Sequence, residues 1–279
     1  MIYLVFGILC SSMLSIFMRI SEKYIKGNIA MLLANYITCT VVAFFSIGPS
    51  NLVTTHDGIG RTLIVGLIAG ALYLSGFTML QFNIRKNGVV LSATFMKLGL
   101  LVSTAVSIFI FHEQPQVMQV IGFVVAIAAI LLINLEKDAA AKVDFKLGLI
   151  ILLICAGMGD TMSKVFDSLC PQALSNHYLI TTFATAGTLC FFVMLLNKQK
   201  IGLYEMIFGM LIGIPNFYSS FFVLKALESL PGMVVFPTFS VGCILVVTLV
   251  GLFFFKEKLS KKQLGALAMI MVALALLNI

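Results

Sequence analysis

Long apolar runs recur along the whole chain, and they constrain its fold more than any other feature. A membrane-spanning helix needs about 20 mostly apolar residues to cross about 30 Å of hydrocarbon. Runs of that length alternate here with short breaks of polar or turn-forming residues, such as Gly48-Pro49-Ser50-Asn51 and Arg85-Lys86-Asn87-Gly88. Only 10% of the residues are charged, against about 25% in soluble domains. The sequence therefore predicts a polytopic membrane protein.

The apolar runs predict an all-α fold with ten transmembrane helices, because barrel strands would alternate in polarity and be about half as long. The first run is interpreted as a helix and not as a removable signal, since it contains no Ala-x-Ala cleavage site. The predicted spans are 2–20, 29–48, 62–82, 88–111, 116–135, 146–166, 175–196, 202–224, 232–255 and 262–279.

Basic residues are distributed unevenly among the segments that join these spans. Thirteen fall on one side of the membrane, only Arg61 and Lys225 fall on the other, and three lie within spans. The positive-inside rule makes the thirteen-residue side cytoplasmic. With ten spans, both termini are then expected on the outer side of the cell membrane. The thirteen residues are Lys23, Lys26, Arg85, Lys86, Lys137, Lys142, Lys146, Lys198, Lys200, Lys256, Lys258, Lys261 and Lys262.

The chain also contains an internal repeat. A shift of 144 residues aligns 73–113 with 217–257 without a gap, and fourteen of the 41 positions are identical, where this composition would give about four by chance. The match predicts two repeats, 1–138 and 139–279, with five helices each. Because five is odd, the second repeat would enter the membrane from the opposite face. Inverted repeats are typical of alternating-access transporters, whose substrate site lies between the halves.

A shared motif closes the fourth span of each repeat. A Glu is followed by a short polar link into a Gly-containing fifth span, as in Phe111-His112-Glu113-Gln114-Pro115 to Gly122, and in Phe255-Lys256-Glu257-Lys258-Leu259-Ser260 to Gly265. On this pattern the chain resembles the drug/metabolite transporter superfamily, EamA-like branch, over nearly its whole length. The resemblance implies a central cavity lined by spans 1, 3, 4, 6, 8 and 9.

The first span, ending Met18-Arg19-Ile20-Ser21-Glu22, is also similar to the small multidrug resistance proteins of that superfamily. Those proteins carry a carboxylate eight residues before the basic residue, where this chain has Ser11 and, in the second repeat, Ala156. This departure counts against proton-coupled export of lipophilic cations by the same route. Many members of the superfamily keep their termini in the cytoplasm, whereas the charge distribution here predicts the reverse.

Four charged residues inside spans are candidate substrate-binding residues, because charge within a membrane is costly and is often retained for function. Lys97 lies nine residues from the cytoplasmic end of its predicted span, about 14 Å deep at 1.5 Å per residue. Asp160 and Lys164 are four residues apart, so they either pair with each other or leave Asp160 to couple protons. Arg19 lies near a helix end, from which it can reach the interface. Acidic residues at helix ends are expected to make interfacial or inter-repeat contacts: Glu22, Glu113, Asp167 and Glu257.

Prolines mark a second group of candidates. Pro215 and Pro237 lie inside predicted spans, where a proline frees a backbone carbonyl and bends the helix. Either the freed carbonyls and the polar residues beside them contact a solute, or the bends serve packing alone. Polar residues of the first repeat could contribute hydrogen bonds or join helices. The candidates of both repeats are Asn35, Tyr36, Tyr73, Gln81, Asn216, Tyr218, Thr238 and Ser240.

These patterns predict a secondary transporter that moves a small polar metabolite by alternating access. Because basic candidates outnumber acidic ones, a carboxylate-bearing or zwitterionic solute such as an amino acid is favoured over a bare cation. A multidrug exporter, a flippase for lipids or lipid-linked precursors, and an accessory subunit remain alternatives.

An enzyme is not expected, because the chain lacks HExxH, GxSxG and ATP-binding motifs. The expected partners are a small-molecule substrate, the lipid bilayer and a second copy of the chain in a homodimer. No cofactor, metal or nucleic acid is expected.

Overall fold

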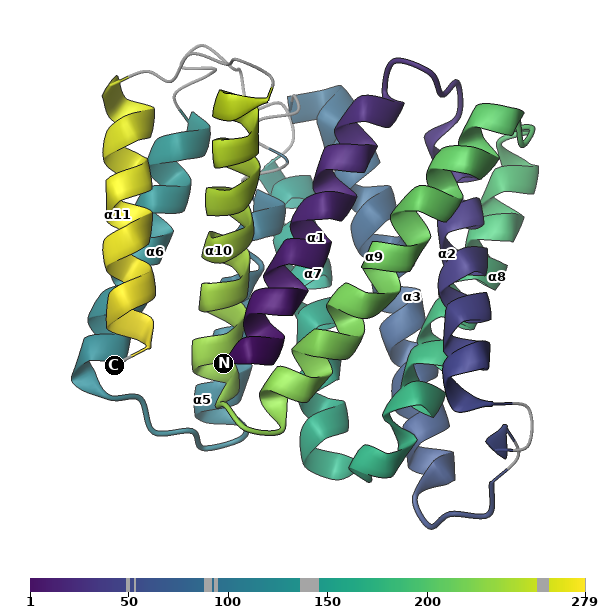
Figure 1. Ribbon diagram of the computed structural model, residues 1–279, viewed down its shortest axis with the longest axis horizontal. Coiled ribbons are helices and arrows are strands. Elements are labelled where there is room, and N and C mark those ends of the chain that lie inside the picture. The colour runs from purple at the N-terminus through teal and green to yellow at the C-terminus, as the bar shows by residue number, and fades with distance from the viewer. Residues whose placement is uncertain are drawn as a thin grey trace. The chain divides into compact units, whose positions relative to one another are not determined.

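The computed structural model (Figure 1) is all-helical over the residues it describes, which are 1–48, 51–52, 54–87, 92, 95–135, 146–254 and 261–278. No strand occurs among them. The helices are α1 (Ile2–Ser21), α2 (Asn28–Ile47), α3 (Ile59–Asn87), α5 (Leu100–Phe109), α6 (Val117–Leu135), α7 (Lys146–Leu169), the 3₁₀ turn η3 (Gln172–Leu174), α8 (Ser175–Leu196), α9 (Leu203–Leu227), α10 (Gly232–Phe253) and α11 (Lys261–Leu277).

Seven helical segments in the described part of the chain are long and apolar enough to cross a membrane. They comprise α1, α2, α3 over Ile59–Ile84, α7, the continuous stretch Gln172–Leu196, α9 and α10. Three shorter apolar helices cover Phe95–Phe109, Val117–Leu132 and Leu264–Leu277. The prediction of an all-helical chain with helices long and apolar enough to span a membrane is confirmed. The number of ten spans stays a prediction.

The chain packs as two compact units. Unit 1 contains Met1–Leu74 and Met162–Ser229, and unit 2 contains Ser75–Thr161 and Leu230–Ile279. The division falls inside α3 and inside α7, so each unit draws helices from both predicted repeats. Packing and sequence repetition therefore divide the chain differently, and the boundary predicted at 138/139 lies outside the described residues.

Unit 1 is held together where α9 crosses α2 and α3 meets α8. A Cβ on Gly213 of α9 would lie only 2.8 Å from the backbone oxygen of Asn35, and one on Gly209 would lie 2.8 Å from the backbone oxygen of Met31. Gly66 of α3 approaches α8 in the same way. Small residues allow helix backbones to approach closely, which is how helices pack in the absence of a hydrophobic drive between them.

Unit 2 has its own apolar core, formed by α5, α6, α10 and α11. Gly122 of α6 lies against α11, where an added Cβ would be 2.9 Å from the Cβ of Leu276 and 3.0 Å from the nitrogen of Leu277. The buried core residues are Leu98, Leu100, Ala126, Ala129, Ile130, Val241, Ile270 and Ala273.

Two predicted spans differ from the observed helices. The predicted span 62–82 lies inside the longer α3, because Arg61 and Lys86 leave the apolar layer without breaking the helix, and basic residues are good helix formers. The predicted span 88–111 is interrupted: the helix that includes Phe95–Lys97 meets a tight turn at Leu98-Gly99 before α5 begins. Residues 88–91, 93 and 94 lie outside the described residues.

Replacing Gly213 by alanine tests the contact between α2 and α9. The new Cβ would lie 2.6 Å from Thr38 Cβ, so the helices must separate, and we expect a loss of about 1–3 kcal/mol. The measurement is the Tm of the purified protein in detergent. Gly60→Ala is the matched control, since nothing lies within 4 Å of a Cβ there and its Tm should not fall. An unchanged Tm for Gly213→Ala would contradict the close contact.

Candidate functional site

The helix interruption at Leu98-Gly99 is the first element of the candidate site. Three amides there donate to carbonyls three residues back, namely Gly99 to Met96 (3.1 Å), Leu101 to Leu98 (2.9 Å) and Val102 to Gly99 (2.9 Å). This is 3₁₀ hydrogen bonding, which marks strain or a hinge when it falls between helical segments. Lys97 is the last residue before the tight turn.

A contact between two glycines places α7 directly against this interruption. A Cβ on Gly99 would lie 2.8 Å from the Gly157 nitrogen, and a Cβ on Gly157 would collide with the Gly99 carbonyl oxygen. The Thr161 hydroxyl donates to the Gly157 carbonyl at 2.7 Å, inside α7. Both glycines therefore have a packing function that no larger residue could fill, and they bring Lys97 and Asp160 to neighbouring positions.

Lys97 and Asp160 interact electrostatically. The Lys97 ammonium lies within electrostatic range of the Asp160 carboxylate, and both side chains are half-buried. Among the ion pairs that the described residues form within 4.0 Å, none joins these two groups. The site therefore combines two opposite charges in apolar surroundings without a direct contact between them. We call this arrangement the Lys97–Asp160 site.

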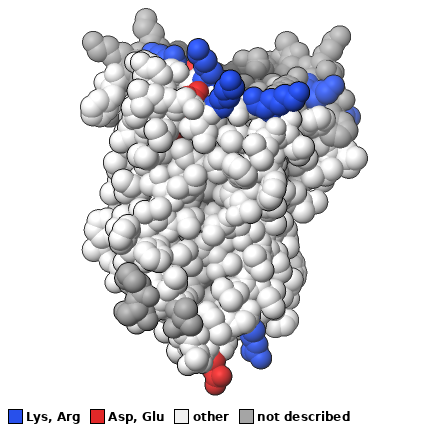
Figure 2. All heavy atoms as spheres, turned by 90° about the vertical axis from the view of Figure 1, so that its right-hand side faces the viewer, with Lys and Arg blue, Asp and Glu red and all other residues white. Residues whose placement is uncertain are grey.

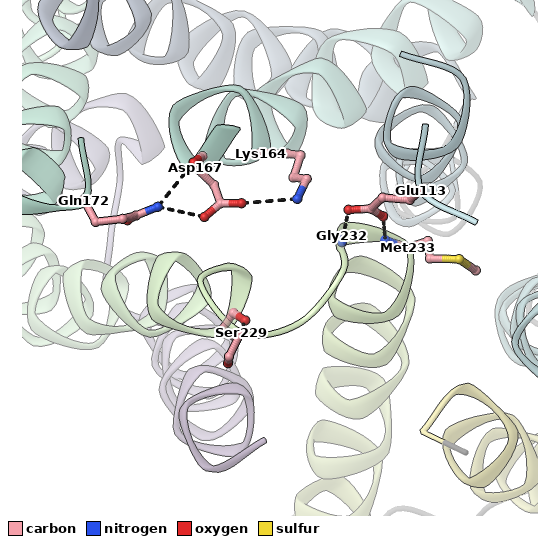
Figure 3. A network of polar contacts seen from close by, with 8 residues as sticks. Glu113, Lys164, Asp167, Gln172, Ser229, Gly232 and Met233 are labelled. Atoms are coloured by element: carbon pink, nitrogen blue, oxygen red, sulfur yellow. Dashed lines mark hydrogen bonds and ion pairs between the residues drawn. The ribbon is translucent and has the colours of Figure 1, made fainter. Parts of the chain in front are cut away.

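Lys164 has a different partner from the one its spacing suggested. Its ion pair is with Asp167, at 3.1 Å, and not with Asp160. The Gln172 amide donates to the other Asp167 oxygen at 2.8 Å, so two nitrogens hold one carboxylate, as Figure 3 shows. Lys164 itself is 8% exposed. The partner lies one turn toward the end of α7 because the η3 turn supplies Gln172 there.

Glu113 forms a second polar contact in Figure 3, within unit 2. Its carboxylate accepts hydrogen bonds from the amides of Gly232 (2.8 Å) and Met233 (2.9 Å), at the first turn of α10. The first amides of a helix lack intrahelical partners, and a carboxylate satisfies them and favours the helix dipole. The contact joins residues of the two predicted repeats, as expected for an acidic residue at a helix end. Glu257, its counterpart in the repeat, lies outside the described residues.

Asn35 and Asn216 join α2 to α9 in unit 1. The Asn216 amide donates to the Asn35 side-chain oxygen at 3.1 Å, and Asn35 is 2% exposed. The Cys39 thiol donates to the Gly213 carbonyl nearby at 3.2 Å. A buried amide pair beside a close glycine contact is typical of a helix–helix contact. The position of Asn216 after Pro215 thus serves packing at least in part.

The remaining predicted residues fall in both units. Tyr36 is buried beside Phe183, with ring centroids 6.4 Å apart, and within electrostatic range of Tyr73. Thr238, in unit 2, accepts a hydrogen bond from Asn278 at 3.5 Å. Four others do not join the Lys97–Asp160 site through any contact described: the exposed Arg19 and Tyr218 of unit 1, and the half-buried Gln81 and Ser240 of unit 2.

Three residues with close contacts in the structure, namely Gly99, Gly157 and Glu205, were not among the sequence candidates. Gly99 and Gly157 could have been found as glycines inside apolar runs, which often mark close helix contacts. Glu205 is 5% exposed although it begins a span-like helix, and an acidic residue in the first helical turn is a capping signal. In the described part of the chain, no group of three or more His, Cys, Asp or Glu residues could hold a metal.

The chain is similar to one known protein in sequence and to another in fold. No protein-family model matches this chain. The chain is 28% identical over 269 residues to an uncharacterized protein of Haemophilus influenzae, covering 92% of this chain and 91% of that protein. Its fold is similar to that of a protein of known crystal structure, with a TM-score of 0.79 and 14% identity over 99% of this chain and 96% of that chain. At this identity the likeness concerns the fold alone.

A double-mutant cycle tests the interaction between Lys97 and Asp160. Lys97→Met or Asp160→Asn alone leaves one charge uncompensated in apolar surroundings, so each should lower the Tm. The double variant should lose less stability than the sum of the losses of the two single variants, with a coupling energy of about 0.5–3 kcal/mol. The control cycle uses Lys225→Met and Glu228→Gln, a pair at a unit surface whose coupling should stay below about 1 kcal/mol. Strict additivity at Lys97 and Asp160 would contradict the site.

Proposed function

We propose that the protein is a secondary transporter of a small polar metabolite, with the Lys97–Asp160 site contacting the solute. The observation that carries the proposal is the pair of half-buried opposite charges beside an interrupted helix in a very apolar chain. Substrate sites of transporters lie near the middle of the membrane, often beside helices that are not continuous. Charges at such positions are costly, so their retention favours function over packing.

The proposal includes ten membrane spans in two inverted repeats and membership of the drug/metabolite transporter superfamily, in the cell membrane. The alignment of 73–113 with 217–257 supports the repeat. Three shorter apolar helices accompany the seven long ones, and they would complete the ten spans. Transport across the bilayer without ATP hydrolysis needs no further domain, and no enzyme activity is proposed.

Comparison of the two repeats separates structural charges from functional ones. Charges at helix ends keep their sign in both repeats: Arg19 corresponds to Lys164, Glu22 to Asp167, and Glu113 to Glu257. The two charges of the site have no charged counterpart. Lys97 corresponds to Val241, and Asp160 corresponds to Ser15. A packing role repeated by the fold would be retained twice, whereas a solute that is not symmetric needs its charges only once.

The chemistry of the site favours a solute that carries a carboxylate. Lys97 offers an ammonium that can donate three hydrogen bonds, and a charge-assisted bond to a carboxylate is about twice as strong as a neutral one. Asp160 would repel a second anionic group and select solutes that carry little further negative charge. A bare lipophilic cation would face the ammonium of Lys97 with no second acidic residue assigned to the site.

Flux through proteoliposomes tests the proposed function. A thermal-shift screen of metabolites on the purified protein first identifies a ligand, and counterflow of that ligand is then measured. Lys97→Ala should reduce counterflow about tenfold or more, because a charge-assisted contact contributes about 1.5–3 kcal/mol. Lys225→Ala, which removes a lysine outside the site, is the control and should leave flux unchanged.

Three results would overturn the proposal. The first is competition by cationic drugs with none by anionic or zwitterionic metabolites, which would indicate a multidrug exporter. The second is translocation of fluorescent lipid without solute counterflow, which would indicate a flippase. The third is full counterflow in Lys97→Ala.

Thiol labelling of intact cells tests the proposed orientation. Lys23 precedes α2 and Asp57 follows it, so the two lie on opposite sides of that span. With the basic segments in the cytoplasm, Asp57→Cys should react with a membrane-impermeant maleimide on intact cells, and Lys23→Cys only after permeabilisation. Labelling of the parent protein gives the background reaction of its own cysteines, which are buried or half-buried. The reverse labelling would place both termini in the cytoplasm.

A further inference from the structure

Two links of unit 1 are tied together at one end of its helices. These are the α1–α2 link, residues 22–27, and the α8–α9 link, residues 197–202. The Glu205 carboxylate accepts hydrogen bonds from the amides of Lys26 (2.7 Å) and Gly27 (3.3 Å). Gly27 also lies against the side chain of Gln199, whose oxygen would be 2.8 Å from an added Cβ. The two links therefore form one surface.

This surface is strongly basic. Lys23 and Lys26 from the first link and Lys198 and Lys200 from the second are all exposed. Glu22 is the exposed acidic residue beside them, since the carboxylate of Glu205 is buried against backbone amides. Figure 2 shows Lys and Arg side chains gathered at one end of the face it draws; the described residues along its middle are uncharged, and the opposite end carries both a basic and an acidic side chain.

The backbone at Lys198 has a conformation that is unfavourable for a residue with a side chain. Lys198 has a φ of +51°, its amide donates to Leu195, and the Gln199 amide donates to Met194. This pattern is a Schellman motif, in which glycine usually occupies the left-handed position. A residue with a side chain costs about 1–2 kcal/mol there. The chain nevertheless places a lysine at that position.

Aromatic side chains cover the edge of the same surface. The Tyr24 ring stacks on Phe208, with centroids 5.6 Å apart, and lies 5.8 Å from the ring of Tyr204. Tyr24 is 50% exposed and Tyr204 is 53% exposed. Tyrosines of membrane proteins gather at the level of the lipid headgroups, where the ring is in apolar surroundings and the hydroxyl is in water. Exposed lysines and tyrosines therefore lie together at one end of these helices.

We propose that this surface binds the headgroup of an anionic phospholipid. The lysines of both links would contact the phosphate and any further negative charge of the headgroup, while Tyr24 and Tyr204 would lie beside the glycerol and upper acyl chains. Basic residues between membrane helices bind anionic headgroups in this way. The bound lipid would bridge α1–α2 and α8–α9, adding to the tie that Glu205 makes.

Lipid-dependent thermal shifts test this site on the full-length protein in mild detergent. Phosphatidylglycerol should raise the Tm in a saturable manner, and phosphatidylcholine with the same acyl chains should not. The variant Lys198→Gly/Lys200→Gln should bind phosphatidylglycerol more weakly, by about fivefold for each lysine removed. Lys198→Gly relieves the left-handed backbone, so this variant should fold at least as well as the parent without lipid.

The matched control is Arg61→Gln/Lys225→Gln, which removes two basic residues from the opposite end of unit 1 and should keep the parent's affinity. The site would be overturned by equal affinity in the Lys198→Gly/Lys200→Gln variant or by equal stabilisation with phosphatidylcholine. Stabilisation by inorganic phosphate with the same dependence on the lysines would identify a free-anion site and overturn the lipid assignment. None of these measurements requires transport.

Discussion

Close contact between helix backbones at glycine is the constraint on which both units depend. In hydrocarbon, helices gain no hydrophobic free energy by associating, because lipid tails are as apolar as their side chains. Contact area and dispersion then decide how helices pack. Gly213 in unit 1 and Gly122 in unit 2 allow the close approach that increases the contact area. The Gly99–Gly157 contact does more, because it also places Lys97 next to Asp160. One backbone contact in unit 2 therefore both packs two helices together and positions two charged side chains.

Three groups of charged residues in the described part of the chain have different physical roles. The first satisfies backbone or side-chain groups at helix ends, as Glu113 does at α10 and Asp167 does with Lys164. The second forms the basic surface of unit 1, where the lysines are exposed. The third is the Lys97–Asp160 site, where two charges remain in apolar surroundings without direct contact, an arrangement that is costly within a membrane.

Sequence reasoning located most helices closely because an apolar run and its turn-forming ends are local features. The predicted spans 116–135 and 175–196 nearly coincide with α6 and α8. The predicted bounds were wrong where a helix extends beyond its apolar run, as α3 does at Arg61 and Lys86. They were also wrong at Leu98-Gly99, where the helix turns tightly beside a residue distant in sequence. The partner of Lys164 was also missed, because helical spacing admits both i+4 and i+3 pairs and only η3 brings Gln172 to Asp167.

The sequence by itself determined the all-helical, membrane-type character of the protein, the bounds of its apolar runs and the imbalance of basic residues among its links. These follow from local composition, since each helix satisfies its own backbone hydrogen bonds. Only the tertiary structure decided that Lys97 acts on Asp160, that Glu113 binds the start of α10, and that lysines from two distant links share one surface. Such pairings depend on which helix faces meet, and in these units that is decided by where glycines permit backbones to touch.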